Sequence, residues 1–173
     1  MNHIVIIGFM GSGKTRVGKK ISQDLGLPFV DVDKAITKKL NMTLKEIFQK
    51  FGEPFYRALE TMTIKELAAD SQKKVVSLGA GLPMQEQNQK IIPTLGTVIY
   101  IKGSYETLRK RLEDSSNPLL EGEDHEVKIQ KLLKQRDPVY AGFADIIVET
   151  GIKPFEDLVA EIIEKISDKE KNS

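Results

Sequence analysis

The hydrophobic positions of the chain form five short apolar runs, separated by longer amphipathic segments. Each run is rich in Ile, Val or Leu and is bounded by glycine, proline or polar residues, which is typical of strands buried on both faces. The intervening segments are long enough for crossover helices, and the first carries Val17, Ile21 and Leu25 at helical spacing. The pattern predicts an α/β fold with a five-stranded parallel sheet and helices on both faces. The expected strands cover residues 4–7, 28–31, 74–78, 96–101 and 145–149.

Capping and stop signals set the expected helix boundaries. Asp33 can cap a helix that ends at Leu40, and Thr43 with Glu46 forms a capping box that opens the next one. Residues 113–124 are polar, contain Pro118 and Gly122 and show no periodicity, so we expect a mobile loop there. We expect one domain over 1–173 and a frayed tail over 169–173. Further helices are expected at 15–25, 54–69, 84–90, 104–112, 127–136, with Pro138 soon after, and 154–166.

Composition narrows the class of protein. A hydrophobic fraction of 40%, a charged fraction of 29% and a net charge of +1 are those of an ordinary soluble domain, with no basis for a nucleic-acid or membrane partner. The absence of cysteine excludes disulfides, thiolate metal sites and thiol catalysis, and no apolar run reaches membrane length, so we expect a cytoplasmic protein.

Arginine is rare, so each one invites a specific explanation such as bidentate binding of an oxyanion. The arginines are Arg16, Arg57, Arg109, Arg111 and Arg136.

A phosphate-binding loop follows the first strand. Gly8 to Thr15 match the pattern G-x-x-x-x-G-K-[ST] between a predicted strand and a predicted helix. In such a loop, glycines let successive N–H groups point at phosphate oxygens near a helix N-terminus. Lys14 would reach the β- and γ-phosphates of a nucleoside triphosphate, and the Thr15 hydroxyl would ligate Mg²⁺. The motif predicts a nucleoside-triphosphate site but does not name the reaction.

Two more groups of residues lie at the carboxyl ends of predicted strands, where open parallel sheets bind ligands. Asp31 and Asp33 could divide their roles, one holding metal-bound water and the other accepting the proton of a substrate hydroxyl. Alternatively, Asp33 only caps a helix and Asp31 is a solvated strand end. The turn from Gly79 to Gly81 offers N–H groups to an anion or a hydroxyl, or is merely a tight turn.

Two arginines have partners or positions that allow different interpretations. Arg57 and Glu60 are three residues apart on one helical face, so Glu60 can hold the guanidinium, although a weak surface ion pair is equally compatible with the spacing. Arg136 precedes Asp137 and Pro138 at an expected helix end, where the helix dipole favours any cation.

Together these motifs resemble those of the shikimate kinase family over nearly the whole chain. The resemblance implies a P-loop kinase fold similar to nucleoside monophosphate kinases, with strand order 2-3-1-4-5 and a mobile lid, here at about 113–124. It also implies transfer of the γ-phosphoryl of ATP to the 3-hydroxyl of shikimate, on the route to chorismate. The motifs are Gly8-Phe-Met-Gly-Ser-Gly-Lys14-Thr15, Asp31-Val-Asp33, Gly52-Glu-Pro-Phe-Tyr-Arg57-Ala-Leu-Glu60, Gly79-Ala-Gly81, Pro118-Leu-Leu120 and Arg136-Asp-Pro-Val-Tyr140.

The resemblance also assigns expected roles to individual residues. Asp33 would be the base and would contact the shikimate hydroxyl, and Asp31 would hold Mg²⁺ with Thr15. Arg57 and Arg136 would clamp the shikimate carboxylate. The substrate pocket would be completed by the backbone of Gly79, Ala80 and Gly81. ATP would be bound by Gly11, Ser12, Gly13, Lys14, Thr15, Arg111 and Asn117 and, at adenine, by Lys153 and Pro154.

Asn117 departs from the family pattern, because the lid usually has an arginine before the proline. An asparagine cannot reproduce the charge of an arginine closing on the ATP phosphates, so Lys110 or Arg111 would have to substitute, or the chemical step would be slow. This leaves two alternatives to shikimate kinase: a related kinase for another hydroxy acid such as gluconate, or a weakened homologue that binds nucleotide and acts through an interaction. We expect a monomer, since no apolar patch is evident.

Overall fold

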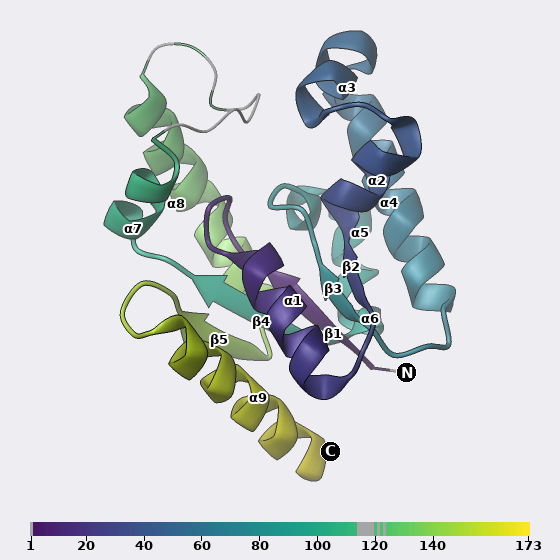
Figure 1. The fold of residues 1–173 in the computed structure, drawn as a ribbon. Helices are drawn as coiled ribbons and strands as arrows, with labels where there is room; N and C mark the ends of the chain where they lie inside the picture. The colour runs from purple at the N-terminus through teal and green to yellow at the C-terminus, as the bar shows by residue number, and fades with distance from the viewer. Residues whose placement is uncertain (1, 114–119, 121, 123) are drawn as a thin grey trace.

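The computed structural model describes residues 2–113, 120, 122 and 124–173, and its centre is a five-stranded parallel sheet (Figure 1). The strand order is β2-β3-β1-β4-β5, as the resemblance predicted. In the register of the sheet, Val5 lies opposite Val76 of β3 and Val98 of β4. The strands are β1 His3–Ile7, β2 Phe29–Asp31, β3 Val75–Ser77, β4 Gly96–Lys102 and β5 Ile146–Glu149.

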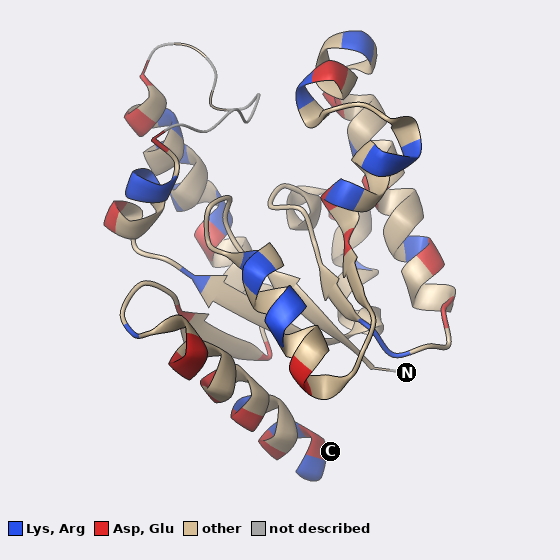
Figure 2. Cartoon of the chain, viewed as in Figure 1, with Lys and Arg blue, Asp and Glu red and all other residues tan. Residues whose placement is uncertain are grey.

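Helices cover both faces of the sheet. Helices α1 and α9 lie together on one face, and α4, α6 and α8 lie on the other (Figure 1). Charged residues are interspersed along the helices and are largely absent from the strands (Figure 2). The helices are α1 Lys14–Leu25, α2 Val32–Leu40, α3 Leu44–Phe51, α4 Glu53–Ala69, the 3₁₀ turn η1 Leu82–Met84, α5 Glu86–Gln89, α6 Ile92–Leu95, α7 Tyr105–Arg111, α8 His125–Phe143 and α9 Phe155–Lys171.

The sheet divides the core into two clusters. All five residues of β1 are buried, and their side chains alternate between the two faces. Ile4 and Ile6 pack with the apolar sides of α1 and α9, whereas Val5 and Ile7 pack with residues of α2, α4 and α8. The sheet therefore lies between two packed layers of apolar side chains. Among the described residues, no helix has the length and apolar character needed to cross a bilayer.

The expected helix over 84–90 is present but shorter, because α5 covers Glu86–Gln89 and Met84 belongs to the preceding 3₁₀ turn η1. Pro93, expected to follow that helix directly, instead lies in the first turn of α6. A proline is tolerated in a first turn because its missing N–H would have no partner there. The side chain of Asn88 is fully buried and donates through Nδ2 to the Leu82 carbonyl at 2.9 Å, which favours this irregular path over a regular helix.

Helices α8 and α9 are longer than the sequence pattern predicted. Pro138 lies inside α8, which continues to Phe143. The Tyr100 hydroxyl donates to Asp137 and Tyr140 is fully buried, so contacts with β4 and the site keep this region helical despite the backbone bond lost at proline. The expected frayed tail is also wrong, because α9 extends to Lys171 and Lys169 pairs with Asp145 at 3.3 Å. Most of the expected lid at 113–124 lies outside the described residues, so its mobility stays a prediction.

Candidate active site

The phosphate loop joins β1 to α1 with the predicted geometry. Gly11 and Gly13 have φ of 78° and 90°, in the left-handed region that side chains with a Cβ rarely adopt. Gly8 is required for another reason: its backbone is extended, but a Cβ there would lie 2.7 Å from the Ile101 carbonyl oxygen. Ser12, within the loop, is completely buried, and its Oγ has no hydrogen-bond partner among the described residues. Gly13, Lys14 and Thr15 line a cavity, so the N-terminus of α1 faces this cavity.

Lys14 lies across the mouth of this loop. Its Nζ donates to the carbonyl oxygens of Gly8 and Phe9, each at 3.0 Å. Burial lowers the pKa of Lys14 to about 8, partly offset by the nearby carboxylates of Asp33 and Asp31. The ammonium is therefore held at the loop by backbone oxygens that an anionic ligand would replace.

Asp31, not Asp33, caps the helix after β2. Its Oδ1 accepts from the Lys34 N–H at 3.1 Å, and its Oδ2 accepts from the Thr15 hydroxyl at 2.5 Å. The prediction that Asp33 is the cap was wrong by two residues, because the helix starts directly at the end of the strand. Thr15 and Asp31 present hard oxygen atoms beside the phosphate loop, a donor set that suits Mg²⁺ when phosphates and water complete its shell. Within the described chain, no group of three His, Cys, Asp or Glu residues could hold a metal by itself.

Asp33 lies in the first turn of α2 and lines the same cavity. The Tyr56 hydroxyl from α4 donates to its Oδ1. Burial raises the pKa of Asp33, whereas the Tyr56 hydrogen bond and the Lys14 charge lower it. Gly79 lies directly behind the carboxylate, since a Cβ there would come within 2.6 Å of Oδ1. Asp33 is thus a largely enclosed carboxylate that points into the cavity.

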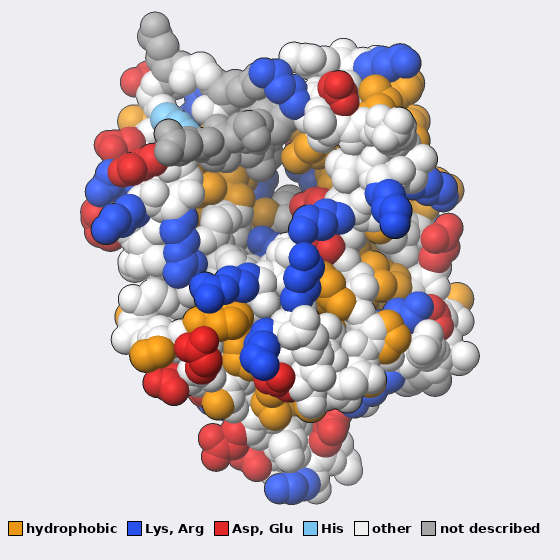
Figure 3. Space-filling model, viewed as in Figure 1, with side chains coloured by type: hydrophobic (Ala, Val, Ile, Leu, Met, Phe, Trp, Pro, Cys, Tyr) orange, Lys and Arg blue, Asp and Glu red, His pale blue; other side chains and the backbone are white. Residues whose placement is uncertain are grey.

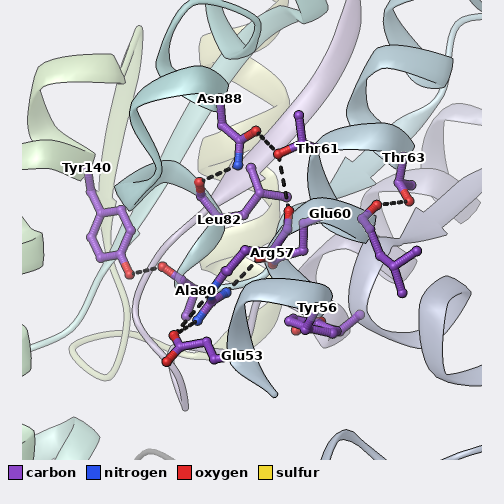
Figure 4. A network of polar contacts seen from close by, with 12 residues as sticks. Glu53, Tyr56, Arg57, Glu60, Thr61, Thr63, Ala80, Leu82, Asn88 and Tyr140 are labelled. Atoms are coloured by element: carbon purple, nitrogen blue, oxygen red, sulfur yellow. Dashed lines mark hydrogen bonds and ion pairs between the residues drawn. The ribbon is translucent and has the colours of Figure 1, made fainter. Parts of the chain in front are cut away.

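Arg57 is held between two glutamates on α4 (Figure 4). Its Nη1 donates to Glu60 Oε1 at 2.6 Å, and its Nη2 donates to Glu53 Oε1 at 3.0 Å. The Arg57–Glu60 pair is buried, so the alternative of a surface ion pair is excluded. Burial raises the pKa of Glu60 to about 7, despite the opposing effect of Arg57, and Glu60 Oε2 has no hydrogen-bond partner in the described structure.

Arg136 lies in the interior of α8, so its position is not explained by a helix end. Arg136 is 7% exposed, and no described residue accepts a hydrogen bond from its Nη1. A buried donor of this kind carries a large desolvation cost unless a ligand accepts its hydrogen bond. Arg136 and Arg57 line one cavity of about 570 Å³, which therefore has two guanidinium groups available for an anion.

The turn from Gly79 to Gly81 forms part of the cavity wall, which Ala80 and Gly81 line. The Tyr140 hydroxyl from α8 donates to the Ala80 carbonyl at 2.5 Å (Figure 4). Gly81 is packed against Arg57, since a Cβ there would lie 2.5 Å from Nη2. The turn is thus fixed between the two helices that carry Arg57 and Arg136.

Sequence reasoning missed several residues that support the site. Thr61 donates to Asn88 Oδ1 at 2.7 Å, which links α4 to the segment after the Gly79–Gly81 turn. Glu53 lies four residues before Arg57, a spacing that could have identified it. The partner of Tyr56 is 23 residues away in the chain, so no local signal predicts that contact.

The expected nucleotide residues beyond the loop are only partly brought together. Arg111 donates to the Gly11 carbonyl at 3.1 Å and to Thr150 Oγ1 at 3.2 Å, so it lies against the phosphate loop. Lys153 pairs with Glu161 of α9, and Pro154 precedes the first turn of that helix; neither lines the cavity. Asn117 lies outside the described residues.

The assembled site is a hollow between the halves of the molecule that carry α8 and α2, with basic side chains along its lower edge (Figure 3). The loop, Thr15 and Asp31 form its phosphate side. Asp33, Arg57, Arg136 and the turn at Ala80 form its other side. This arrangement can hold a phosphate chain next to a small anion that bears a hydroxyl group.

Comparison with known proteins gives a consistent result. The family model for shikimate kinase matches residues 10–167. The shikimate kinase of Dictyoglomus turgidum is 40% identical over 166 residues, covering 94% of this chain and 95% of that protein. The shikimate kinase of Thermodesulfovibrio yellowstonii is 41% identical over 167 residues, covering 95% of this chain and 94% of that protein.

Solved structures agree with the sequence relatives. A shikimate kinase from Acinetobacter baumannii in complex with shikimate superposes with a TM-score of 0.91 at 34% identity, covering 98% of this chain and 94% of that one. A gluconokinase from Sinorhizobium meliloti has a TM-score of 0.62 at 17% identity, covering 99% of this chain and 94% of that one, which shows a shared fold alone. On its sequence, its strand order and its matched length, the chain belongs to the shikimate kinase family.

Proposed function

We propose that this protein transfers the γ-phosphoryl group of ATP to the 3-hydroxyl of shikimate. The observation that carries the proposal is the partnerless buried Nη1 of Arg136, which shares a cavity with Arg57 beside the phosphate loop. Two guanidinium groups suit a planar carboxylate, which accepts parallel hydrogen bonds. Shikimate carries one carboxylate and ring hydroxyls, so it would occupy both the arginines and Asp33.

On the nucleotide side, the N–H groups of Gly11, Ser12 and Gly13 would face the phosphates at the N-terminus of α1. Lys14 would exchange its bonds to Gly8 and Phe9 for bonds to the β- and γ-phosphates. Mg²⁺, held by Thr15 and Asp31, would neutralise phosphate charge when bound. Arg111 would meet the nucleotide next to Gly11, and Asn117, Lys153 and Pro154 are proposed contacts from the lid and the adenine side.

On the acceptor side, Asp33 would accept the proton of the shikimate hydroxyl as its oxygen attacks. The new bond forms between that oxygen and the γ-phosphorus, the bond from the γ-phosphorus to the bridging oxygen breaks, and ADP leaves with both electrons of that bond. Glu60 holds Arg57 in place, and the turn over Gly79, Ala80 and Gly81 would support the substrate ring. Catalysis would come mainly from positioning and charge stabilisation.

A coupled assay of ADP release tests the proposal. With ATP and Mg²⁺ present, we expect ADP release to depend on shikimate and to remain at background with gluconate. Release with gluconate but not shikimate would identify another hydroxy-acid kinase. Tight ATP binding without either activity would indicate a homologue that binds nucleotide without turnover.

A monomeric state, a cytoplasmic location and the absence of nucleic-acid or membrane partners also remain proposals, resting on composition and net charge. Size-exclusion chromatography with light scattering tests the first, and a dimer mass would contradict it.

A further inference from the structure

Tyr56 lies at the catalytic carboxylate but has no part in the function proposed above. It is on α4, immediately before Arg57, and its side chain is 2% exposed. Its ring packs against Phe48 with centroids 5.4 Å apart, which fixes the direction of the hydroxyl. Burial and the nearby charge of Asp33 raise the pKa of Tyr56, so the hydroxyl keeps its proton and acts as a donor.

The Tyr56 hydroxyl is hydrogen-bonded to one of the two carboxylate oxygens of Asp33. Tyr56 donates to Oδ1, and the same oxygen lies against the backbone of Gly79, where a Cβ would approach to 2.6 Å. Oδ1 is therefore enclosed on two sides. The other oxygen, Oδ2, accepts no hydrogen bond from a described residue. It is also absent from the set of fully buried, unpaired polar atoms, so it is open toward the cavity that Asp33 lines. The two oxygens of one carboxylate are thus in different surroundings.

We propose that Tyr56 is a positioning residue for phosphoryl transfer, because its hydroxyl fixes Oδ1 of Asp33 and leaves Oδ2 for the substrate hydroxyl. The inference rests on the proposed role of Asp33 as base. A carboxylate without this bond could rotate about its side-chain torsion, and fewer of its orientations would be productive.

The test is Tyr56→Phe, which removes one oxygen atom and keeps the packed ring. Tyr100→Phe is a matched control, because Tyr100 is 1% exposed and its hydroxyl also donates to an aspartate, Asp137, outside this cavity. For Tyr56→Phe we expect kcat to fall about tenfold while the KM for ATP stays unchanged. Tyr100→Phe should change neither quantity, although both variants should lose similar thermal stability.

A kcat for Tyr56→Phe within twofold of the parent would overturn the inference. An equal fall in kcat for Tyr100→Phe would also overturn it, because the loss would then follow from general destabilisation.

A crystal structure of the free Tyr56→Phe protein separates this inference from the proposed function. A rotated or multiply oriented Asp33 carboxylate supports the positioning contact even if shikimate is not the substrate. An unchanged single orientation refutes it, even in an active kinase.

Discussion

Replacing Arg136 by methionine should make the free protein more stable while weakening shikimate binding. Methionine has a similar length and no charge, so it can fill the buried path of the side chain. In the free protein the Nη1 donor is buried and unpaired among the described residues. The substitution removes that desolvation cost, which is about 1–3 kcal/mol for an unsatisfied buried group.

The two effects have opposite signs and can be measured separately. For a chain of this length, each kcal/mol raises Tm by about 3 °C, so we expect an increase of roughly 3–9 °C without ligand. A hydrogen bond to a charged group contributes about 1.5–3 kcal/mol, so the KM for shikimate should rise by roughly 10- to 100-fold or more. Arg57 would remain, and it should retain part of the affinity.

Scanning calorimetry with and without shikimate, together with the ADP-release assay, measures both quantities. Lys131→Met is the matched control, since it removes one exposed positive charge from the same helix and should change neither Tm nor KM appreciably. A lower Tm for Arg136→Met would show that the guanidinium stabilises the free protein. An unchanged KM for shikimate would refute its role as a carboxylate ligand.

Four other perturbations test the remaining roles. Asp33→Asn should lower kcat by about 10²- to 10⁴-fold while the Kd for ATP, measured by calorimetry, stays the same; a near-normal kcat would exclude Asp33 as the base. Asp31→Asn keeps an oxygen for the helix cap but loses the charge, so the Mg²⁺ concentration for half-maximal activity should rise roughly tenfold; no change would place the metal elsewhere. Asn117→Arg should raise kcat about tenfold or more if the lid lacks a phosphate-contacting cation; an unchanged kcat would mean that another residue supplies it. Folding raises the pKa of Glu60 from 4.5 to about 7, so the folded state binds this proton more tightly than the unfolded state. The resulting contribution to the free energy of unfolding is fully present below pH 4.5 and is lost as the pH rises through 7. Urea unfolding of Glu60→Gln should lack that decline in stability, and an identical decline would contradict the assignment to Glu60.

Contiguous features of the site could be predicted from the sequence. The phosphate loop needs only neighbouring residues, and its glycines take the conformations that the motif requires. The Arg57–Glu60 pair was found because three residues on a helix bring side chains to one face. Five buried runs with crossover segments were sufficient for the parallel sheet.

The features that were missed depend on contacts between distant segments. Aspartate is equally good as a cap at positions 31 and 33, so only the direct junction of β2 with α2 shows that Asp31 is the cap. The position of Arg136 was misread because Pro138 predicts a helix end, and packing against β4 overrides that preference. The contact of Tyr56 with Asp33 depends on how α4 crosses the strand ends, which no local pattern describes.

The bonds from Lys14 to its own loop have a consequence for chemical labelling. With a pKa of about 8, Lys14 in the empty loop should be roughly half uncharged at pH 8. The uncharged fraction of an ordinary solvated lysine at that pH is on the order of a hundredfold smaller. An amine-acylating reagent should therefore modify Lys14 early, provided that the loop is empty, whereas bound phosphates would keep its proton in place. Covalent labelling read by mass spectrometry would then report the fraction of molecules whose phosphate loop is vacant.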